Sequence, residues 1–127
     1  MYWIVDDPFD GAREPGGEVR ELRGVLKPKI VAEVNDAYVK LVKVKGEFVW
    51  HRHETEDELF LVVRGRMHLQ TREEAVCLEA GDMAVVPRGT EHRPVAAEEA
   101  HVLLIEPKST LNTGNVQDGR TTEAEWI

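Results

Sequence analysis

From residue 29 onward the chain is a succession of short apolar stretches, each followed by residues typical of turns. The stretches are rich in β-branched and aromatic residues, and they are too short and too closely spaced for a set of helices. Many short strands at close spacing predict an all-β fold, an antiparallel sandwich or barrel. The expected strands cover residues 29–34, 37–45, 47–53, 58–63, 66–71, 75–80, 83–87 and 101–107.

The two ends of the chain lack this pattern. Residues 6–17 are rich in Asp, Gly and Pro and indicate an irregular N-terminal arm within residues 1–28, with at most one short helix at residues 18–26. Residues 108–127 form a polar, turn-rich tail, and the sequence leaves open whether this tail packs on the barrel. A length of 127 residues fits a single domain, 1–127, with its core barrel at about residues 29–107.

The acidic composition restricts the partners that the chain can have. A formal net charge of −8 repels nucleic-acid phosphates and anionic lipids. No apolar run approaches the ~20 residues that span a bilayer, and the N-terminus lacks the basic region of a signal peptide. Cys77 is the only cysteine, so an intramolecular disulfide is excluded, and we expect a buried thiol. These features predict a cytoplasmic protein that binds neither nucleic acid nor membrane.

The expected strand at residues 58–63 is apolar at nearly every position after Glu58. A strand with one face in water alternates between apolar and polar residues. The lack of alternation predicts that both faces are covered, by a second sheet or by a partner subunit. We therefore expect a homodimer.

Three histidines and one glutamate have the arrangement of a metal site. His51 and His53 are two residues apart, so on a strand their imidazoles point the same way. Glu58 begins the next expected strand, after a charged turn, and His92 follows a turn that contains Pro87 and a glycine. Neutral imidazoles and an ionised carboxylate suit Mn, Fe, Co, Ni, Cu or Zn. Asp57 is the alternative to Glu58 if the turn is shorter.

Other side chains near these segments are candidates for substrate binding. Arg88 and Arg93 flank the second histidine segment, where either could hold a carboxylate or a phosphate, and His101 opens the last expected strand. Surface or rim positions are the alternative for all three. Phe48 and Trp50 are expected on the strand face opposite His51, where they would serve packing.

The two histidine segments resemble the two motifs of the cupin superfamily. The first, GEFVWHRHETEDELFLVVRG, runs from Gly46 to Gly65 and is one residue short before its first histidine. The second, GDMAVVPRGTEH, begins at Gly81, and Ala96 stands where the family has an asparagine. Residues 66–80 between the motifs are few, as in small single-domain cupins. The wider pattern is similar to small cupins labelled mannose-6-phosphate isomerase-like.

The resemblance implies a cupin-type antiparallel β-barrel, or jelly roll. It also implies one divalent transition metal per chain (Mn, Fe, Ni or Zn), held by His51, His53, Glu58 and His92. Cupins include dioxygenases, decarboxylases and isomerases, so fold does not select the reaction on a small-molecule substrate. The alternative is a non-catalytic cupin that binds or senses a small ligand. Catalytic residues are not identified by the sequence.

Overall fold

We describe residues 27–127 of a computed structural model of the protein. The expected helix at residues 18–26 and the arm at residues 6–17 lie outside the described residues. Within the described part every regular element is a strand, which confirms the predicted all-β class. The strands are β1 (Lys29–Val34), β2 (Ala37–Glu47), β3 (Glu58–Arg64), β4 (Arg66–Thr71), β5 (Ala75–Glu79), β6 (Met83–Val86), β7 (His92–Pro107) and β8 (Glu125–Trp126).

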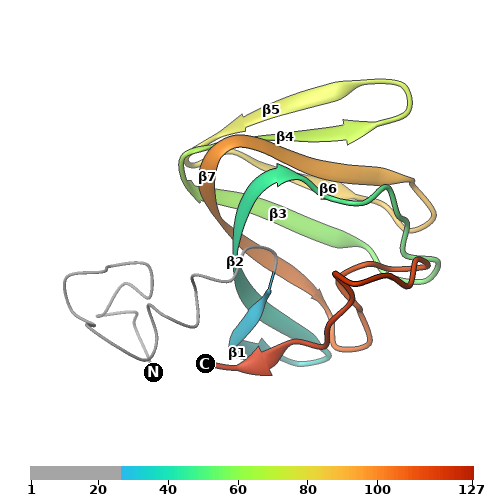
Figure 1. Ribbon diagram of the computed structural model, residues 1–127. Helices are drawn as coiled ribbons and strands as arrows, with labels where there is room; N and C mark the ends of the chain where they lie inside the picture. The colour runs from blue at the N-terminus through green and yellow to red at the C-terminus, as the bar shows by residue number, and fades with distance from the viewer. Residues whose placement is uncertain (1–26) are drawn as a thin grey trace.

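These strands form one strongly curved sheet with the hydrogen-bonded order β5-β4-β7-β2-β1-β8, to which β3 is joined through β7 and β6 through β3. The long strand β7 changes partners along its length, from β4 at its start to β3 near its end, while β2 accompanies it. Figure 1 shows both long strands bending through the molecule, with the β4–β5 hairpin at one end and β1 with β8 at the other. A sheet that curls in this way encloses an interior, as in a jelly roll.

The pairing is antiparallel throughout the described strands except between β1 and β8, which are parallel. The sequence did not predict β8. One predicted strand is absent, because β2 ends at Glu47 and residues 48–57 contain only an isolated bridge between His51 and His92. The register of β2 shifts between Val44 and Gly46, whose φ of 78° is a left-handed conformation that glycine adopts without strain. The segment that carries the first two histidines therefore leaves the sheet.

The core fills the inside of the curved sheet. Alternate residues of β2, β3 and β7 face inward, and burial of this kind supplies most of the stabilisation of a small β domain. The strand β3 shows the alternation clearly, because Phe60 and Val62 are buried whereas Leu59 and Leu61 are only half-buried. The buried apolar cluster consists of Val42, Val44, Phe60, Val62, Met67, Leu69, Leu78, Val86, Ala96, Ala100, Val102 and Leu104.

The C-terminal tail packs against the barrel, which settles a question that the sequence left open. The backbone N–H of Asn115 donates to the carbonyl oxygen of Arg52 at 3.0 Å, and the Arg52 N–H donates to Asn115 Oδ1 at 2.8 Å. A Cβ at Gly114 would overlap the Arg52 carbonyl group, so only glycine fits this close approach. The tail thereby fixes the irregular segment between His51 and His53 from outside.

Two side chains of the β4–β5 hairpin are exposed. One is His68 on β4. Cys77 was expected to be buried, and that prediction is wrong: it lies exposed on β5, where only Leu78 is buried. β5 is an edge strand of the sheet, so most of its side chains have no second layer to pack against.

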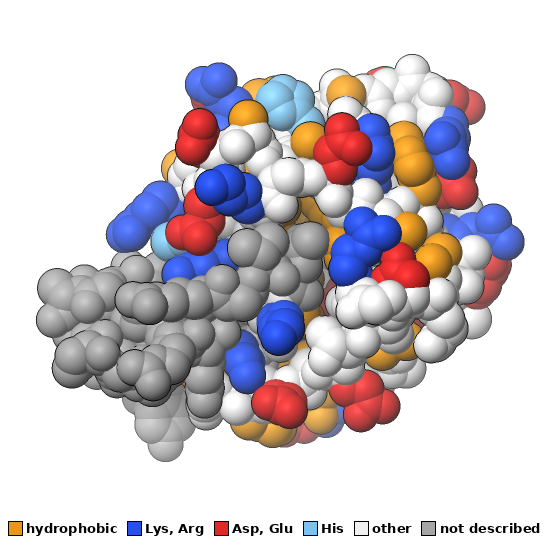
Figure 2. Space-filling model, in the orientation of Figure 1, with side chains coloured by type: hydrophobic (Ala, Val, Ile, Leu, Met, Phe, Trp, Pro, Cys, Tyr) orange, Lys and Arg blue, Asp and Glu red, His pale blue; other side chains and the backbone are white. Residues whose placement is uncertain are grey.

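Charged side chains of both signs are interleaved over the surface that Figure 2 shows, with apolar side chains between them. Many form ion pairs across neighbouring strands or turns, such as Arg66 with Glu79 at 2.6 Å and Arg72 with Glu91 at 2.5 Å. Exposed pairs of this kind contribute little to stability. Within the part of the chain that the structure describes, no helix has the length and hydropathy that crossing a lipid bilayer requires.

Candidate metal centre

Four side chains converge inside the barrel. One nitrogen from each of His51, His53 and His92 and one carboxylate oxygen of Glu58 all lie within 4.8 Å of one another. Each of these residues is at most 4% exposed. The structure therefore brings together the four residues that the sequence pattern singled out, even though the first two do not lie on a regular strand.

Backbone hydrogen bonds hold the histidine segments side by side. The His51 N–H donates to the His92 carbonyl at 3.0 Å, and the His92 N–H donates back to the His51 carbonyl at 2.8 Å. Farther along, the Gly89 N–H donates to the carbonyl of His53 at 2.8 Å. The turn before β7 is thus fastened to the irregular segment after β2, while Glu58 enters from the first position of β3.

The second nitrogen of two imidazoles is fixed by the backbone. Nδ1 of His51 lies 2.9 Å from the Val49 carbonyl oxygen, and Nδ1 of His92 lies 2.8 Å from the Thr90 carbonyl oxygen. A carbonyl oxygen only accepts, so each Nδ1 carries the hydrogen and donates it. In the neutral rings Nε2 is then a bare lone pair, the form in which histidine binds a metal.

The resulting cluster contains acceptors that face one another. Nε2 of His92 lies 3.2 Å from Glu58 Oε1, and Nε2 of His53 lies 3.4 Å from the same oxygen. A lone pair on Nε2 and an anionic oxygen at this distance repel unless a cation lies between them. Both ring nitrogens of His53 are buried and without a hydrogen-bond partner in the described structure. One of the two nitrogens of a neutral imidazole is an acceptor, and a bound cation would compensate it.

The protonation states favour ligation. Burial, followed by the neighbouring His92, lowers the pKa of His51 to about 4, so this imidazole is neutral near pH 7. Burial opposes ionisation of Glu58, but its contacts with Glu106, His53 and His92 outweigh that effect and hold the pKa of Glu58 well below its ordinary value. Metal ligands must be deprotonated, and both groups meet that requirement.

The donor set fits a first-row divalent transition metal. Two donors that each lie about 2.1 Å from one ion at a right angle are about 3 Å apart, close to the separations between Glu58 Oε1 and the two imidazole nitrogens. Nitrogen and oxygen donors without a thiolate suit Mn, Fe, Ni or Zn. Four protein ligands leave positions open on a six-coordinate ion, as a reactive site requires.

Comparison with known proteins agrees with this geometry. Residues 38–106, more than half of the chain, match the family model described as "Cupin domain". The chain belongs to the cupin family.

Similar proteins and structures come from several bacteria. The Bacillus subtilis protein YdbB is 37% identical over 79 residues, which are 61% of this chain and 70% of YdbB. A crystal structure of a cupin-2 domain protein from Shewanella frigidimarina is 46% identical, with a TM-score of 0.65 over 66% of this chain and 82% of that one. A protein from Neisseria meningitidis is 28% identical, with a TM-score of 0.64 over 70% and 91% of the two chains. These likenesses confirm the predicted cupin fold.

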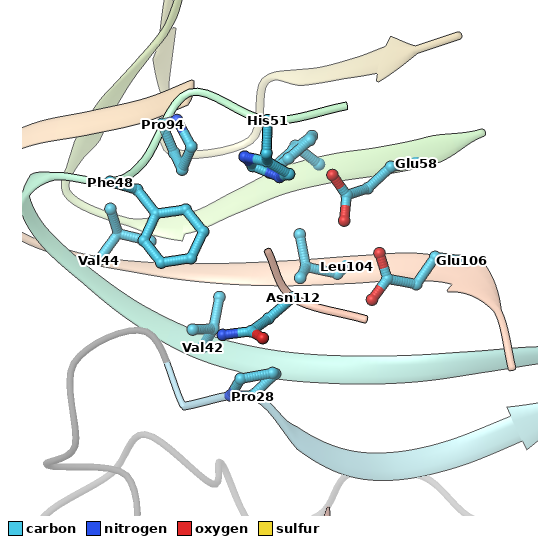
Figure 3. Close-up of a pocket in the computed structure, with 11 residues that line it drawn as sticks. Pro28, Val42, Val44, Phe48, His51, Glu58, Pro94, Leu104, Glu106 and Asn112 are labelled. Atoms are coloured by element: carbon cyan, nitrogen blue, oxygen red, sulfur yellow. The ribbon is translucent and has the colours of Figure 1, made fainter. Parts of the chain in front are cut away.

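A cavity adjoins the four-residue cluster in the cupin barrel (Figure 3). His51 and Glu58 form one part of its wall, and apolar side chains form most of the rest. The Phe48 ring meets the His51 ring edge-on, with ring centroids 5.4 Å apart. The lining consists of Pro28, Val42, Val44, Phe48, His51, Glu58, Phe60, Pro94, Leu104, Glu106 and Asn112.

Asp57, the alternative to Glu58, lies outside the cluster. Its carboxylate accepts from the backbone N–H of Arg88 at 2.9 Å and from the Arg88 guanidinium at 3.3 Å. The hydrogen bonds from Arg88 lower the pKa of Asp57. The structure therefore places Glu58, and not Asp57, among the three histidines.

Arg88, Arg93 and His101 do not line the cavity, and their roles in substrate binding stay predictions. Arg93 donates to Gln70 at 2.8 Å and to Glu47 at 3.1 Å. His101 is buried on β7, with Nε2 3.1 Å from Glu99 Oε2. The structure thus places all three beside other protein side chains rather than at the cavity wall.

Sequence reasoning missed three residues of the site. Phe48 was expected on the face opposite His51, and that prediction is wrong because the segment is not a strand and the ring lines the cavity. Lys40 and Glu106 were not singled out. The signal was present, since Lys40 has the same strand parity as the core residues Val42 and Val44, and Glu106 has the parity of Leu104.

Proposed function

We propose that this cupin binds one divalent transition metal ion through His51, His53, Glu58 and His92 and uses it to act on a small molecule in the adjoining cavity. One observation carries the proposal. Three imidazoles and one carboxylate are buried together, with Nε2 atoms and a carboxylate oxygen facing one another at 3.2 and 3.4 Å. Buried acceptors that face one another need a cation or a proton to compensate them.

A bound ion would supply Lewis acidity or redox chemistry to a substrate oxygen. The residues of the chain prepare the site for it. The carbonyl groups of Val49 and Thr90 fix the tautomer and ring orientation of His51 and His92. Glu58 contributes the single negative charge of the ligand set, and the apolar cavity wall limits the access of water to the reacting group.

Elemental analysis of untagged protein tests the proposal, after expression and after reconstitution with Mn, Fe, Ni and Zn in turn. We expect about one ion per chain with at least one of these metals. A stoichiometry near zero with all four would contradict the proposal. An affinity tag rich in histidine would confound the measurement, so the tag must be absent.

Metal exchange separates the possible reaction classes. Oxygenase or decarboxylase chemistry predicts O₂ consumption or CO₂ release that depends on a redox metal, whereas an isomerase needs Lewis acidity alone and works with Zn. A non-catalytic ligand-binding cupin predicts thermal stabilisation by a small molecule that survives chelation of the metal. The same purified protein serves all three measurements.

We also propose that the cupin forms a homodimer through the outer face of β3, β6 and β7. In register across these strands, Leu59 lies opposite Val85 and Ile105, and Leu61 lies opposite Met83. Met83 and Val85 are 66% and 56% exposed. The opposite face of these strands packs in the core. A contiguous apolar face of this kind supports the proposal that a second copy of the chain packs against it.

Light scattering coupled to size-exclusion chromatography tests the dimer. We expect a dimer for the wild-type protein and a monomer for Val85→Arg, because a guanidinium in a buried apolar interface is costly. Ala75→Arg is the matched control, since Ala75 is exposed at the start of β5, a strand that is not part of the proposed face. A wild-type monomer, or dissociation by both variants, would contradict the proposed interface.

A further inference from the structure

The segment that carries His51 and His53 lies between two sets of contacts. On one side, the carbonyl oxygens of both histidines accept hydrogen bonds from the backbone N–H groups of His92 and Gly89, at 2.8 Å each. Arg52, between the two histidines, instead presents its backbone N–H and carbonyl group to the C-terminal tail. The first two donors of the metal cluster are therefore held by the turn before β7 on one side and by the tail on the other.

A single residue of the tail, Asn115, binds both backbone groups of Arg52. Its Oδ1 accepts from the Arg52 N–H at 2.8 Å, and its own N–H donates to the Arg52 carbonyl at 3.0 Å. A residue of a neighbouring antiparallel strand exchanges the same two bonds, so Asn115 takes the place of such a strand, with Oδ1 as the acceptor. Gly114 permits this approach, because a Cβ there would overlap the Arg52 carbonyl group and lie 3.1 Å from Cδ2 of the His51 ring.

The tail also contacts both ends of the same irregular segment. Ser109 Oγ donates to Glu56 Oε2 at 2.7 Å, and the Arg120 guanidinium lies 5.8 Å from the centroid of the Phe48 ring. Figure 1 shows the tail, drawn in red, passing this segment on its way to β8. The tail and the segment that carries the first two histidines are therefore neighbours along most of the segment.

Internal hydrogen bonds brace the tail. The Thr113 side chain is 0% exposed, and its hydroxyl donates to the Val116 carbonyl at 2.6 Å and lies 2.7 Å from Thr121 Oγ1. Asn112 Nδ2 donates to a backbone carbonyl across the loop at 2.7 Å. A loop with these bonds of its own leaves or joins the barrel as one unit, so the contact at Asn115 reports on the docking of the whole loop.

We infer that Asn115 is a positioning residue for the proposed metal site, and that docking of the C-terminal tail is coupled to metal binding. The inference rests on the proposed function, since it requires a metal ion at His51 and His53. Ligands that are already held in place lose little conformational freedom when they bind an ion, so docking of the tail raises the affinity for the ion. Coupling of two equilibria is reciprocal, so the bound ion in turn favours docking of the tail.

Two variants of nearly equal size test the role of Asn115. Asn115→Leu removes the acceptor, and we expect the dissociation constant for Zn²⁺ to rise about fivefold, the effect of one net hydrogen bond. Asn115→Asp keeps an acceptor for the Arg52 N–H and should keep the wild-type affinity. Competition with a chromophoric chelator measures these constants, at high ionic strength to screen the added charge. Gln117→Ala is the control, because Gln117 is an exposed residue of the same loop.

Two glycines of the tail give a second matched pair. A Cβ at Gly114 must displace the tail from Arg52, whereas a Cβ at Gly119 meets nothing within 4 Å. We expect Gly114→Ala to weaken Zn²⁺ binding by about tenfold or more and Gly119→Ala to leave it unchanged. Circular dichroism checks that both variants fold. If Gly114→Ala does not fold, the Asn115 variants decide the question.

Hydrogen exchange of the Asn115 amide, followed by NMR, tests the coupling in the opposite direction. This N–H is bonded to the Arg52 carbonyl, so its exchange requires that the tail leave the segment. We expect Zn²⁺ to slow this exchange about fivefold, the same factor as in the affinity measurement. The amide of Ile127 is the control, because it donates to Ile30 at the far end of the tail and should respond less.

Equal dissociation constants for wild-type protein, Asn115→Leu and Gly114→Ala would overturn the inference. An exchange rate at Asn115 that does not respond to Zn²⁺ would overturn it too. In either case the proposed metal function stands, because the wild-type protein still binds the ion. A stoichiometry near zero in wild-type protein with all four metals would overturn the proposed function and this inference together.

Discussion

Two buried polar clusters lie next to each other in this barrel, and their charges are compensated in different ways. The Lys40–Glu106 pair carries its own counterion, with Nζ and Oε1 2.8 Å apart. The cluster of His51, His53, Glu58 and His92 contains one carboxylate and three imidazoles, and no lysine or arginine is among its members. The charge of Glu106 is therefore balanced by a side chain of the protein, whereas the second cluster has the donor set of a metal site.

The comparison teaches what each cluster does for the fold. A buried ion pair that is complete contributes modestly, but removal of one partner is costly because the other charge remains buried. A cluster of neutral imidazoles tolerates the absence of a cation better, since a neutral ring has a small desolvation cost. We therefore expect substitutions in the first cluster to change stability and substitutions in the second to change metal binding.

The largest expected effect is on metal binding. His53→Ala removes one of four ligands, and we expect the loss of nearly all bound metal in elemental analysis after gel filtration. His68→Ala is the matched control, because His68 is an exposed histidine of the neighbouring strand β4. Unchanged metal content in the His53 variant would remove this residue from the ligand set. It would also contradict the expectation that substitutions in this cluster change metal binding.

The next effect is on stability. Lys40→Met leaves the Glu106 carboxylate buried without its counterion, and we expect the free energy of unfolding to fall by about 3–5 kcal/mol. The double variant with Glu106→Leu should recover most of that loss, because no unpaired charge remains. Urea denaturation of the single and double variants measures both values. Equal destabilisation by the two would show that packing, rather than charge compensation, sets the effect.

The effect of pH on the free energy of unfolding of the metal-free protein should be somewhat smaller than the effect of Lys40→Met. Burial lowers the pKa of His51 to about 4, below the value of about 6.5 in an unfolded chain, so folding favours the neutral ring. The contribution of His51 to the free energy of unfolding does not change above pH 6.5. Up to about 3 kcal/mol of it is lost as the pH falls from 6.5 toward 4. Urea denaturation at several pH values with a chelator measures this loss, and His51→Gln should reduce its slope.

The smallest expected effect concerns the exposed pair of Arg88 and Asp57. Solvent screens this pair, so Arg88→Ala should leave the urea midpoint and the metal content unchanged. A titration of wild-type protein and of this variant with inorganic phosphate tests whether Arg88 binds an anion, as the sequence predicts. A clear loss of metal in this variant would show that the turn at Asp57 positions Glu58. The exposed Arg88–Asp57 pair would then belong to the residues that support the metal site.

Much of this molecule follows from local patterns. The boundaries of β1, β3 and β4 agree with the predicted strands to within one residue, because alternation and turn residues mark them in the sequence. The strand β7 begins at His92, well before the predicted start at residue 101. Residues 96–100 have the sequence AAEEA, with little intrinsic preference for a strand, and pairing of Ala96 and Ala100 with β2 overrides that preference here.

The His51–His53 pair shows how a correct result can follow from a partly wrong local argument. The sequence predicts both imidazoles on one face of a strand, yet residues 48–57 form no strand in the described structure. The two rings converge because backbone bonds from His92 and Gly89 hold the segment on one side and the C-terminal tail holds it on the other. Contacts so distant in sequence leave no periodic signal, so sequence analysis cannot locate them.

The sequence by itself determined the all-β class, the cupin motifs and the identity of the four donors, because residue type, spacing and strand alternation are local properties. Only the tertiary structure decided that Phe48 lines the cavity, that Asp57 is paired with Arg88, and that Glu106 meets Glu58 across two paired strands. These outcomes depend on which segments lie side by side, and that is set by long-range packing and register, which no short stretch of sequence encodes alone.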